Sequence, residues 1–208
     1  MLRSLKVAGW PRVVLAAWLG CALAGVSQSQ SIGLVVKDGA TVAAPVFASF
    51  QQQTELGLKQ IVAGPELRVA WRAEGQMARG EVYDRLIVMH FRGDCSLAAT
   101  ELSTRRGPLG ETWVTDGRIL PFVEVDCGRV KETLARTMMW RRPVLSPDVL
   151  ARALSRVALH EIYHVLTGRK HHDDEGLFKA EYSAEDLLTP RLGCSKRPLM
   201  LTEVAQQR

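Results

Sequence analysis

The chain has 208 residues, a length that suits a single domain with a sizeable hydrophobic core. It contains no internal repeats or low-complexity segments, and 27 basic residues stand against 22 acidic ones, which gives a formal charge of +5. The basic residues do not form a stripe interleaved with aromatic residues, so the sequence does not support nucleic-acid binding.

The first 24 residues differ in character from the rest of the chain. Three basic residues precede a short apolar run at 13–19, and a small-x-small sequence follows at 22–24. This layout is typical of a secretory signal peptide, and the apolar run is short for a membrane span. We therefore expect residues 1–24 to be a signal peptide and the protein to be secreted or periplasmic, with membrane attachment only if this segment stays uncleaved. Its removal lowers the formal charge from +5 to +2.

The first half of the mature chain predicts three strands and one helix. The apolar run at 32–36 is rich in β-branched residues and predicts a strand. Apolar residues recur with a helical period over 45–62, which predicts an amphipathic helix that ends near Gly64. Alternating apolar residues at 67–71 predict a half-buried strand, and the continuous apolar run at 86–91 predicts a central one.

The second half predicts a pair of strands followed by helices. The segment 113–125 contains two apolar runs joined by the turn sequence Asp116-Gly117, which predicts an antiparallel pair. Pro121 in the second run cannot donate a hydrogen bond to a neighbouring strand, so we expect it at a sheet edge or a bulge. Helices are expected over 130–140 and, more briefly, over 184–188.

One further helix carries the most informative pattern, His160-Glu161-Ile162-Tyr163-His164. Ser146, followed by a proline and an aspartate, predicts its start, and Gly168 predicts its end. Ala153, Val157 and the two histidines fall on one inward-facing stripe. Histidines four residues apart on a helix can bind one metal ion, and the intervening glutamate can reach a water on that metal.

A catalytic zinc ion usually has three protein ligands and one position open to water. Candidates for the third ligand lie downstream of the motif: His171, His172, Glu175, Glu181 and Glu185. Adjacent histidines do not easily aim at one ion, so only one of that pair is expected to bind. A carboxylate from the next helix would give a gluzincin-like site, but a solvated helical face also explains Glu181 and Glu185. A lone histidine in a strand is usually packed or hydrogen-bonded, so His90 is expected to be structural.

The stretch 160–188 resembles two groups of HExxH proteins. In metzincins a glycine and a third histidine follow the motif. Here Gly168 lies one residue later than the glycine of the metzincin pattern, and His171-His172 lie one or two residues later than its histidine. The stretch is more similar to uncharacterised exported bacterial HExxH proteins, in which a histidine follows the glycine by four residues and a Gly-Leu/Ile-Met-Arg/Lys-Ala run follows that. In this chain the run is 176–180, with Phe178 in place of methionine. The resemblance implies that His172 is the third ligand, with His171 as the alternative.

Three cysteines remain beyond the signal segment, in a compartment where disulfides persist. Cys95 follows one predicted strand and Cys127 ends another, so we expect a disulfide between them. Cys194 would then be free or pair elsewhere. Three buried, reduced thiols are the alternative.

The order of elements predicts an α+β domain over 31–190, followed by a loosely held tail at 191–208. In this domain a mixed β-sheet carries the long HExxH helix packed on it, and the resemblance implies a zincin-like, specifically metzincin-like, fold.

These features predict a secreted zinc metallopeptidase, a hydrolase that acts on peptide or protein substrates. His160, His164 and His172 would bind zinc, which lowers the pKa of its water and polarises the scissile carbonyl. Glu161 would act as the general base and pass the proton to the leaving amine. The alternatives are a catalytically silent, exported metal-binding domain and a gluzincin-like site with Glu185. A closed structural zinc site is disfavoured because the sequence has no four-ligand Cys/His cluster.

Overall fold

The structure is a computed structural model that describes residues 29–37, 42–63, 66–98, 107–141 and 145–190, together with residues 193 and 199. The expected signal peptide at 1–24, Cys194 and most of the expected tail at 191–208 lie outside these residues. Within the described part of the chain, no helix has both the length and the apolar composition needed to cross a membrane.

Five strands form one mixed sheet in the order β2-β1-β3-β5-β4. The strands are β1 (Gln30–Lys37), β2 (Leu67–Ala73), β3 (Arg85–Arg92), β4 (Gly110–Thr115) and β5 (Arg118–Asp126). β1 pairs in parallel with β2 and β3, β3 pairs in parallel with β5, and β4 runs antiparallel to β5. The predicted central strand is therefore confirmed as β3. In the described residues β4 pairs with β5 alone and forms an edge of the sheet.

Pro121 satisfies one of the two expectations made for it. β5, which contains it, lies between β3 and β4, so the expectation of an edge strand is wrong. The expectation of a bulge is confirmed, because the register with β4 is irregular between Thr112 and Val114, opposite the proline. Pairing with β3 begins only at Phe122. The sheet thus accommodates a residue without an N–H where neither neighbouring strand needs that donor.

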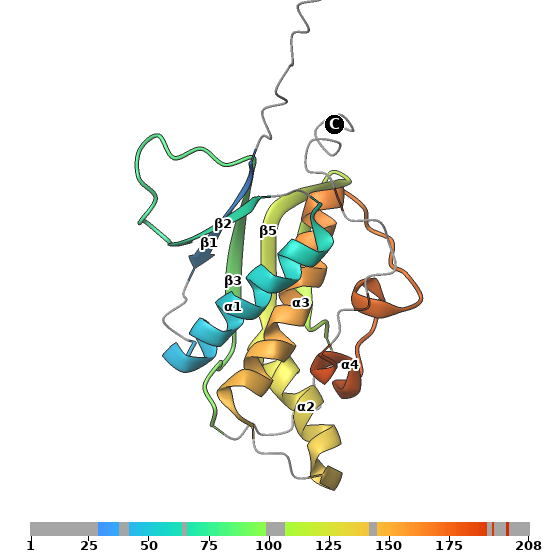
Figure 1. Cartoon of the computed structure of the whole chain (residues 1–208). Helices are drawn as coiled ribbons and strands as arrows, with labels where there is room; N and C mark the ends of the chain where they lie inside the picture. Colours follow the sequence, from blue (N-terminus) through green and yellow to red (C-terminus); the bar gives the residue numbers. More distant parts are fainter. Residues whose placement is uncertain are drawn as a thin grey trace, which may run out of the picture.

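Two helices, α1 (Ala44–Ile61) and α3 (Pro147–Thr167), lie side by side on one face of the sheet (Figure 1). The inward side chains of three strands pack beneath them and are buried: Ile32, Leu34, Val36, Ile87, Met89, Phe91, Val123 and Val125. Gly57 of α1 lies against Leu159 of α3, and a Cβ atom there would collide with the leucine side chain. The helices therefore approach closely because position 57 has no side chain. The predicted mixed sheet with the long helix packed on it is confirmed.

α3 begins and ends where the sequence predicts. The Ser146 hydroxyl accepts a hydrogen bond from the backbone N–H of Val149 at 3.3 Å, and Gly168 adopts φ 65°. Nearly every residue after Leu150 is buried, because the sheet, α1 and the segment 176–188 enclose the helix. The helix is thus more enclosed than a single apolar stripe would predict. That segment contains the expected short helix α4 (Ala184–Leu188) and a 3₁₀ helix that was not predicted, η2 (Gly176–Phe178).

The predicted disulfide between Cys95 and Cys127 is present, with 5.0 Å between the two Cα atoms. It joins the chain just beyond β3 to the first residue of α2 (Cys127–Arg141). Both cysteines are fully buried. The cross-link therefore fixes the start of α2 against the end of the central strand.

Two residues of the expected loose tail make backbone contacts with the domain. The Leu199 N–H donates to the Ile61 carbonyl at 2.7 Å, and its own carbonyl accepts from the Ala63 N–H at 2.7 Å. The Gly193 carbonyl lies directly against Gly176, where a Cβ atom would not fit. At these two residues the tail therefore lies against the domain.

Candidate metal centre

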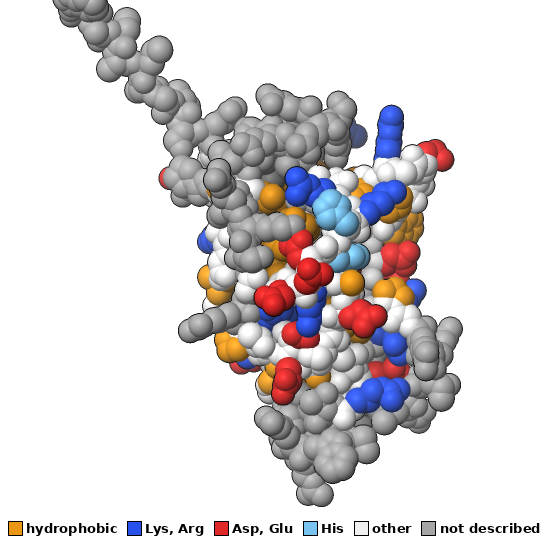
Figure 2. Space-filling view, turned by 90° about the vertical axis from the view of Figure 1, so that its right-hand side faces the viewer, with side chains coloured by type: hydrophobic (Ala, Val, Ile, Leu, Met, Phe, Trp, Pro, Cys, Tyr) orange, Lys and Arg blue, Asp and Glu red, His pale blue; other side chains and the backbone are white. Residues whose placement is uncertain are grey.

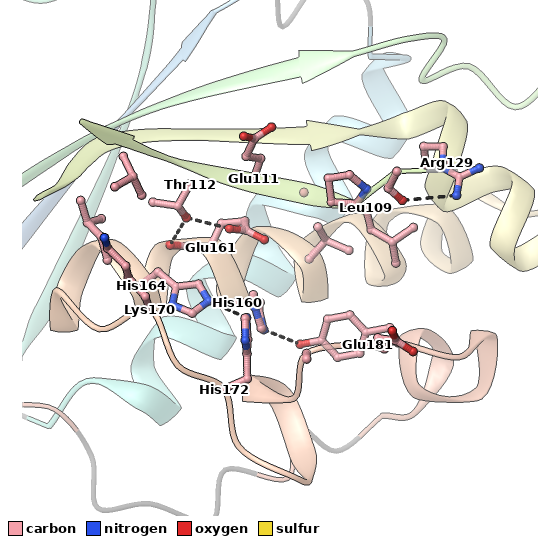
Figure 3. Close-up of a pocket in the computed structure, with 18 of the residues that line it drawn as sticks. Leu109, Glu111, Thr112, Arg129, His160, Glu161, His164, Lys170, His172 and Glu181 are labelled. Atoms are coloured by element: carbon pink, nitrogen blue, oxygen red, sulfur yellow. Dashed lines mark hydrogen bonds between the residues drawn. The ribbon is translucent and has the colours of Figure 1, made fainter. Parts of the chain in front are cut away.

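Three histidine side chains converge in a pocket beside α3 (Figure 3). His160 and His164 are buried on the helix, whereas His172 is exposed on the loop that follows it. The Nε2 atom of His164 lies 3.0 Å from Nε2 of His160 and 3.2 Å from Nε2 of His172. The structure brings these three residues together, and His171 is not part of the cluster.

Backbone carbonyls orient the two motif imidazoles. Nδ1 of His160 lies 2.9 Å from the Leu177 carbonyl oxygen, and Nδ1 of His164 lies 2.6 Å from the Arg169 carbonyl oxygen. A carbonyl can only accept, so both Nδ1 atoms carry the proton and both Nε2 atoms present lone pairs. Two lone pairs 3.0 Å apart repel each other unless a cation lies between them. The arrangement is that of ligands aimed at an ion.

The spacing of the nitrogens fits zinc. In a tetrahedral site with Zn–N bonds of 2.0–2.1 Å, neighbouring nitrogens are about 3.3 Å apart, close to the observed 3.0 and 3.2 Å. Burial lowers the pKa of His160 to about 4 and also lowers the pKa of His164. Both imidazoles are therefore neutral near pH 7, which is the form that binds metal.

The cluster opens into a pocket of about 670 Å³. β4 forms one wall, the segment 180–182 forms the opposite wall, and α3 lies between them (Figure 3). Arg129 and Lys170 also line the pocket. Figure 2 shows histidine side chains at the surface on this side of the molecule, among basic and acidic groups. The site is thus reachable from solvent and large enough for part of a chain-like ligand.

Glu161 lies on the side of α3 that faces β4 (Figure 3). Its side chain is buried, and its Oε2 atom accepts a hydrogen bond of 2.7 Å from the Thr112 hydroxyl. Burial raises the pKa of Glu161 to about 7; the Thr112 hydrogen bond lowers it and the nearby Glu111 charge raises it. A carboxyl group that titrates near neutrality suits a general base.

The other candidate ligands lie apart from the cluster. Glu185 is exposed on α4, and Glu175 is exposed before η2. Glu181 lines the pocket, but its carboxylate points away from the imidazoles (Figure 3). Among the described residues, no carboxylate belongs to the cluster. His90 contacts Glu124 at 3.3 Å on the sheet, in keeping with the structural role expected for it.

Aromatic residues pack beside the histidine cluster. The Tyr182 hydroxyl lies 3.1 Å from Nδ1 of His160 and also donates to the Leu177 carbonyl. Phe178 stacks on Tyr163 with 3.6 Å between the ring centroids. Tyr182 therefore packs behind a ligand, and the apolar ring of Phe178 packs against the motif residue Tyr163.

The contribution of β4 to the site was not predicted from the sequence. Gly110 and Thr112 both line the pocket and both contact Glu161. Their spacing of two residues, which puts side chains on the same face of a strand, was the available signal. It did not reveal the partner, which lies 49 residues further along the chain.

No protein-family model matches the chain, and its sequence is not significantly similar to any curated protein. Among solved structures, it is similar to the crystal structure of archaemetzincin from Methanopyrus kandleri, with a TM-score of 0.47 and 15% sequence identity. The match covers 89% of this chain and 98% of that one.

Proposed function

We propose that this chain is a zinc-dependent hydrolase, specifically a metallopeptidase that acts outside the cytoplasm on peptide or protein substrates. The observation that carries the proposal is the pair of facing Nε2 lone pairs on His160 and His164, whose Nδ1 protons are held by backbone carbonyls. His172 would supply the third nitrogen. Three ligands leave one coordination position for water, as in catalytic rather than structural sites.

The residues around the cluster have roles in such a reaction. When bound, zinc supplies Lewis-acid chemistry, lowering the pKa of a water molecule and polarising a carbonyl group. Glu161 accepts a proton from the attacking water and then donates it to the leaving amine. Its buried position and its pKa of about 7 suit both transfers. A purely structural metal site would have no use for this carboxylate.

The substrate class follows from the position of β4. An extended peptide can add to an exposed sheet edge through backbone hydrogen bonds. β4 is an edge strand in the described residues and lines the pocket beside the histidines. A peptide paired with β4 would therefore pass over the cluster. The signal-like sequence at 1–24 supports export, and so an extracellular or periplasmic substrate.

The test compares wild-type protein with Glu161→Gln and Glu185→Gln for zinc content and for cleavage of a mixed peptide library. Glu161→Gln should keep its zinc and lose roughly 10²- to 10⁴-fold in rate, the usual contribution of acid–base catalysis. Glu185→Gln should match the wild type in both measurements, because Glu185 is exposed and lies outside the cluster. Loss of zinc in Glu185→Gln would favour the gluzincin-like alternative. Wild-type protein that binds zinc but cleaves no peptide would favour a silent metal-binding domain.

A further inference from the structure

The hydroxyl group of Thr112 contacts two oxygens of Glu161. It lies 2.7 Å from the side-chain oxygen Oε2 and 3.1 Å from the backbone carbonyl oxygen. A hydroxyl has one proton to donate, and a hydrogen bond to a carboxylate is shorter and stronger than one to a neutral acceptor. The proton therefore goes to Oε2. Figure 3 shows Thr112 extending from β4 toward the helix, whereas Glu111 points the other way.

A second residue of β4 confines the stem of the same glutamate. A Cβ atom at Gly110 would lie 3.0 Å from Cγ of Glu161 and would also press on Val157. The glutamate side chain thus lies in a narrow space between β4 and α3. Its stem lies against Gly110, its Oε2 atom is bound by Thr112, and the residue also lines the pocket.

We propose that Thr112 is the positioning residue of the general base. Its hydroxyl fixes one oxygen of the Glu161 carboxylate, so that the other is presented toward the water bound near the histidines. The inference rests on the proposed role of Glu161. It also means that one strand performs two tasks, since β4 would align the peptide and hold the base that acts on it. A base fixed in this way needs no reorganisation when the substrate arrives.

The experiment uses Thr112→Val, which keeps the shape and removes the hydroxyl, and Thr112→Ser, which keeps the hydroxyl. Glu185→Gln, an exposed position outside the cluster and outside β4, is the control. Thr112→Val should lower kcat roughly 10- to 100-fold, because small misplacement of a catalytic group has effects of this order. Its KM and zinc content should stay unchanged. Thr112→Ser should recover most of the loss, and Glu185→Gln should match the wild type.

Crystal structures of the wild type and Thr112→Val give a measurement that does not depend on activity. The Glu161 carboxylate should occupy one rotamer in the wild type and several in Thr112→Val. An unchanged rotamer together with an unchanged kcat in Thr112→Val would overturn the inference. A raised KM that serine does not rescue would also overturn it, because it would assign Thr112 to strand packing. The wild type could cleave no peptide while Glu161 still has one rotamer in the wild type and several in Thr112→Val. In that case the proposed function fails while the positioning role stands.

Discussion

Reduction of the Cys95–Cys127 disulfide should destabilise the protein without emptying the metal centre. The bond closes a loop across a sequence separation of 32 residues. In the chain-entropy treatment a loop of this length restricts the unfolded state by about 3.7 kcal/mol at 25 °C. For a domain of this size that loss corresponds to a fall in Tm of roughly 10 °C. None of the three histidines lies within the loop or beside the sulfurs in sequence, so zinc should stay bound after reduction.

Urea unfolding of the wild type with and without reductant measures this difference while leaving both sulfur atoms in the core. The Cys95→Ala/Cys127→Ala protein should be insensitive to reductant. Cys194→Ala should behave like the wild type, which assigns the effect to the predicted pair. Coincident unfolding curves for the oxidised and reduced wild type would refute the reasoning, and so would a reductant effect that disappears in Cys194→Ala.

Two further predictions concern α3 and its buried glutamate. Gly168→Ala places a side chain in open space at a residue with φ 65°. Calorimetry should therefore show a free energy of unfolding lower by about 1–2 kcal/mol, from backbone strain alone. An unchanged free energy of unfolding would contradict the left-handed conformation at the end of the helix. The pKa of Glu161 is raised in the folded, metal-free protein. Its contribution to the free energy of unfolding is therefore fully present below about pH 4.5 and is lost as the pH rises through about 7. Metal-free Glu161→Gln should therefore gain stability relative to the wild type, by up to about 3 kcal/mol, between pH 4.5 and pH 8 in urea titrations. A difference that is constant with pH would contradict the burial of this carboxyl group.

Local signals predicted the HExxH helix well. Ser146 and Gly168 determine the two ends through hydrogen bonds and a backbone angle that involve only neighbouring residues, so no tertiary information was needed. The same holds for the helix 184–188, where Ser183 and Asp186 form a capping box. The sequence also predicted the disulfide, because Cys95 follows one predicted strand and Cys127 ends another.

Features that depend on distant parts of the chain were less predictable. The strand order places β5 inside the sheet, and the local effect of Pro121 could suggest only an edge or a bulge. The burial of α3 on nearly all sides arises from α1, β4 and the segment 176–188, which periodicity within the helix cannot show. The contact between Thr112 and Glu161 joins β4 and α3, which are distant in sequence and become neighbours only in the folded domain.

Zinc analysis of the purified mature protein tests the central claim most directly. The wild type should contain about one zinc ion per chain, as three-ligand catalytic sites do. His160→Ala and His164→Ala should each lose stoichiometric zinc, because each removes an Nε2 atom of the cluster. His172→Ala should bind zinc more weakly, and His171→Ala, which lies outside the cluster, should bind it like the wild type. Full zinc content in both His160→Ala and His164→Ala would contradict the proposed metal centre.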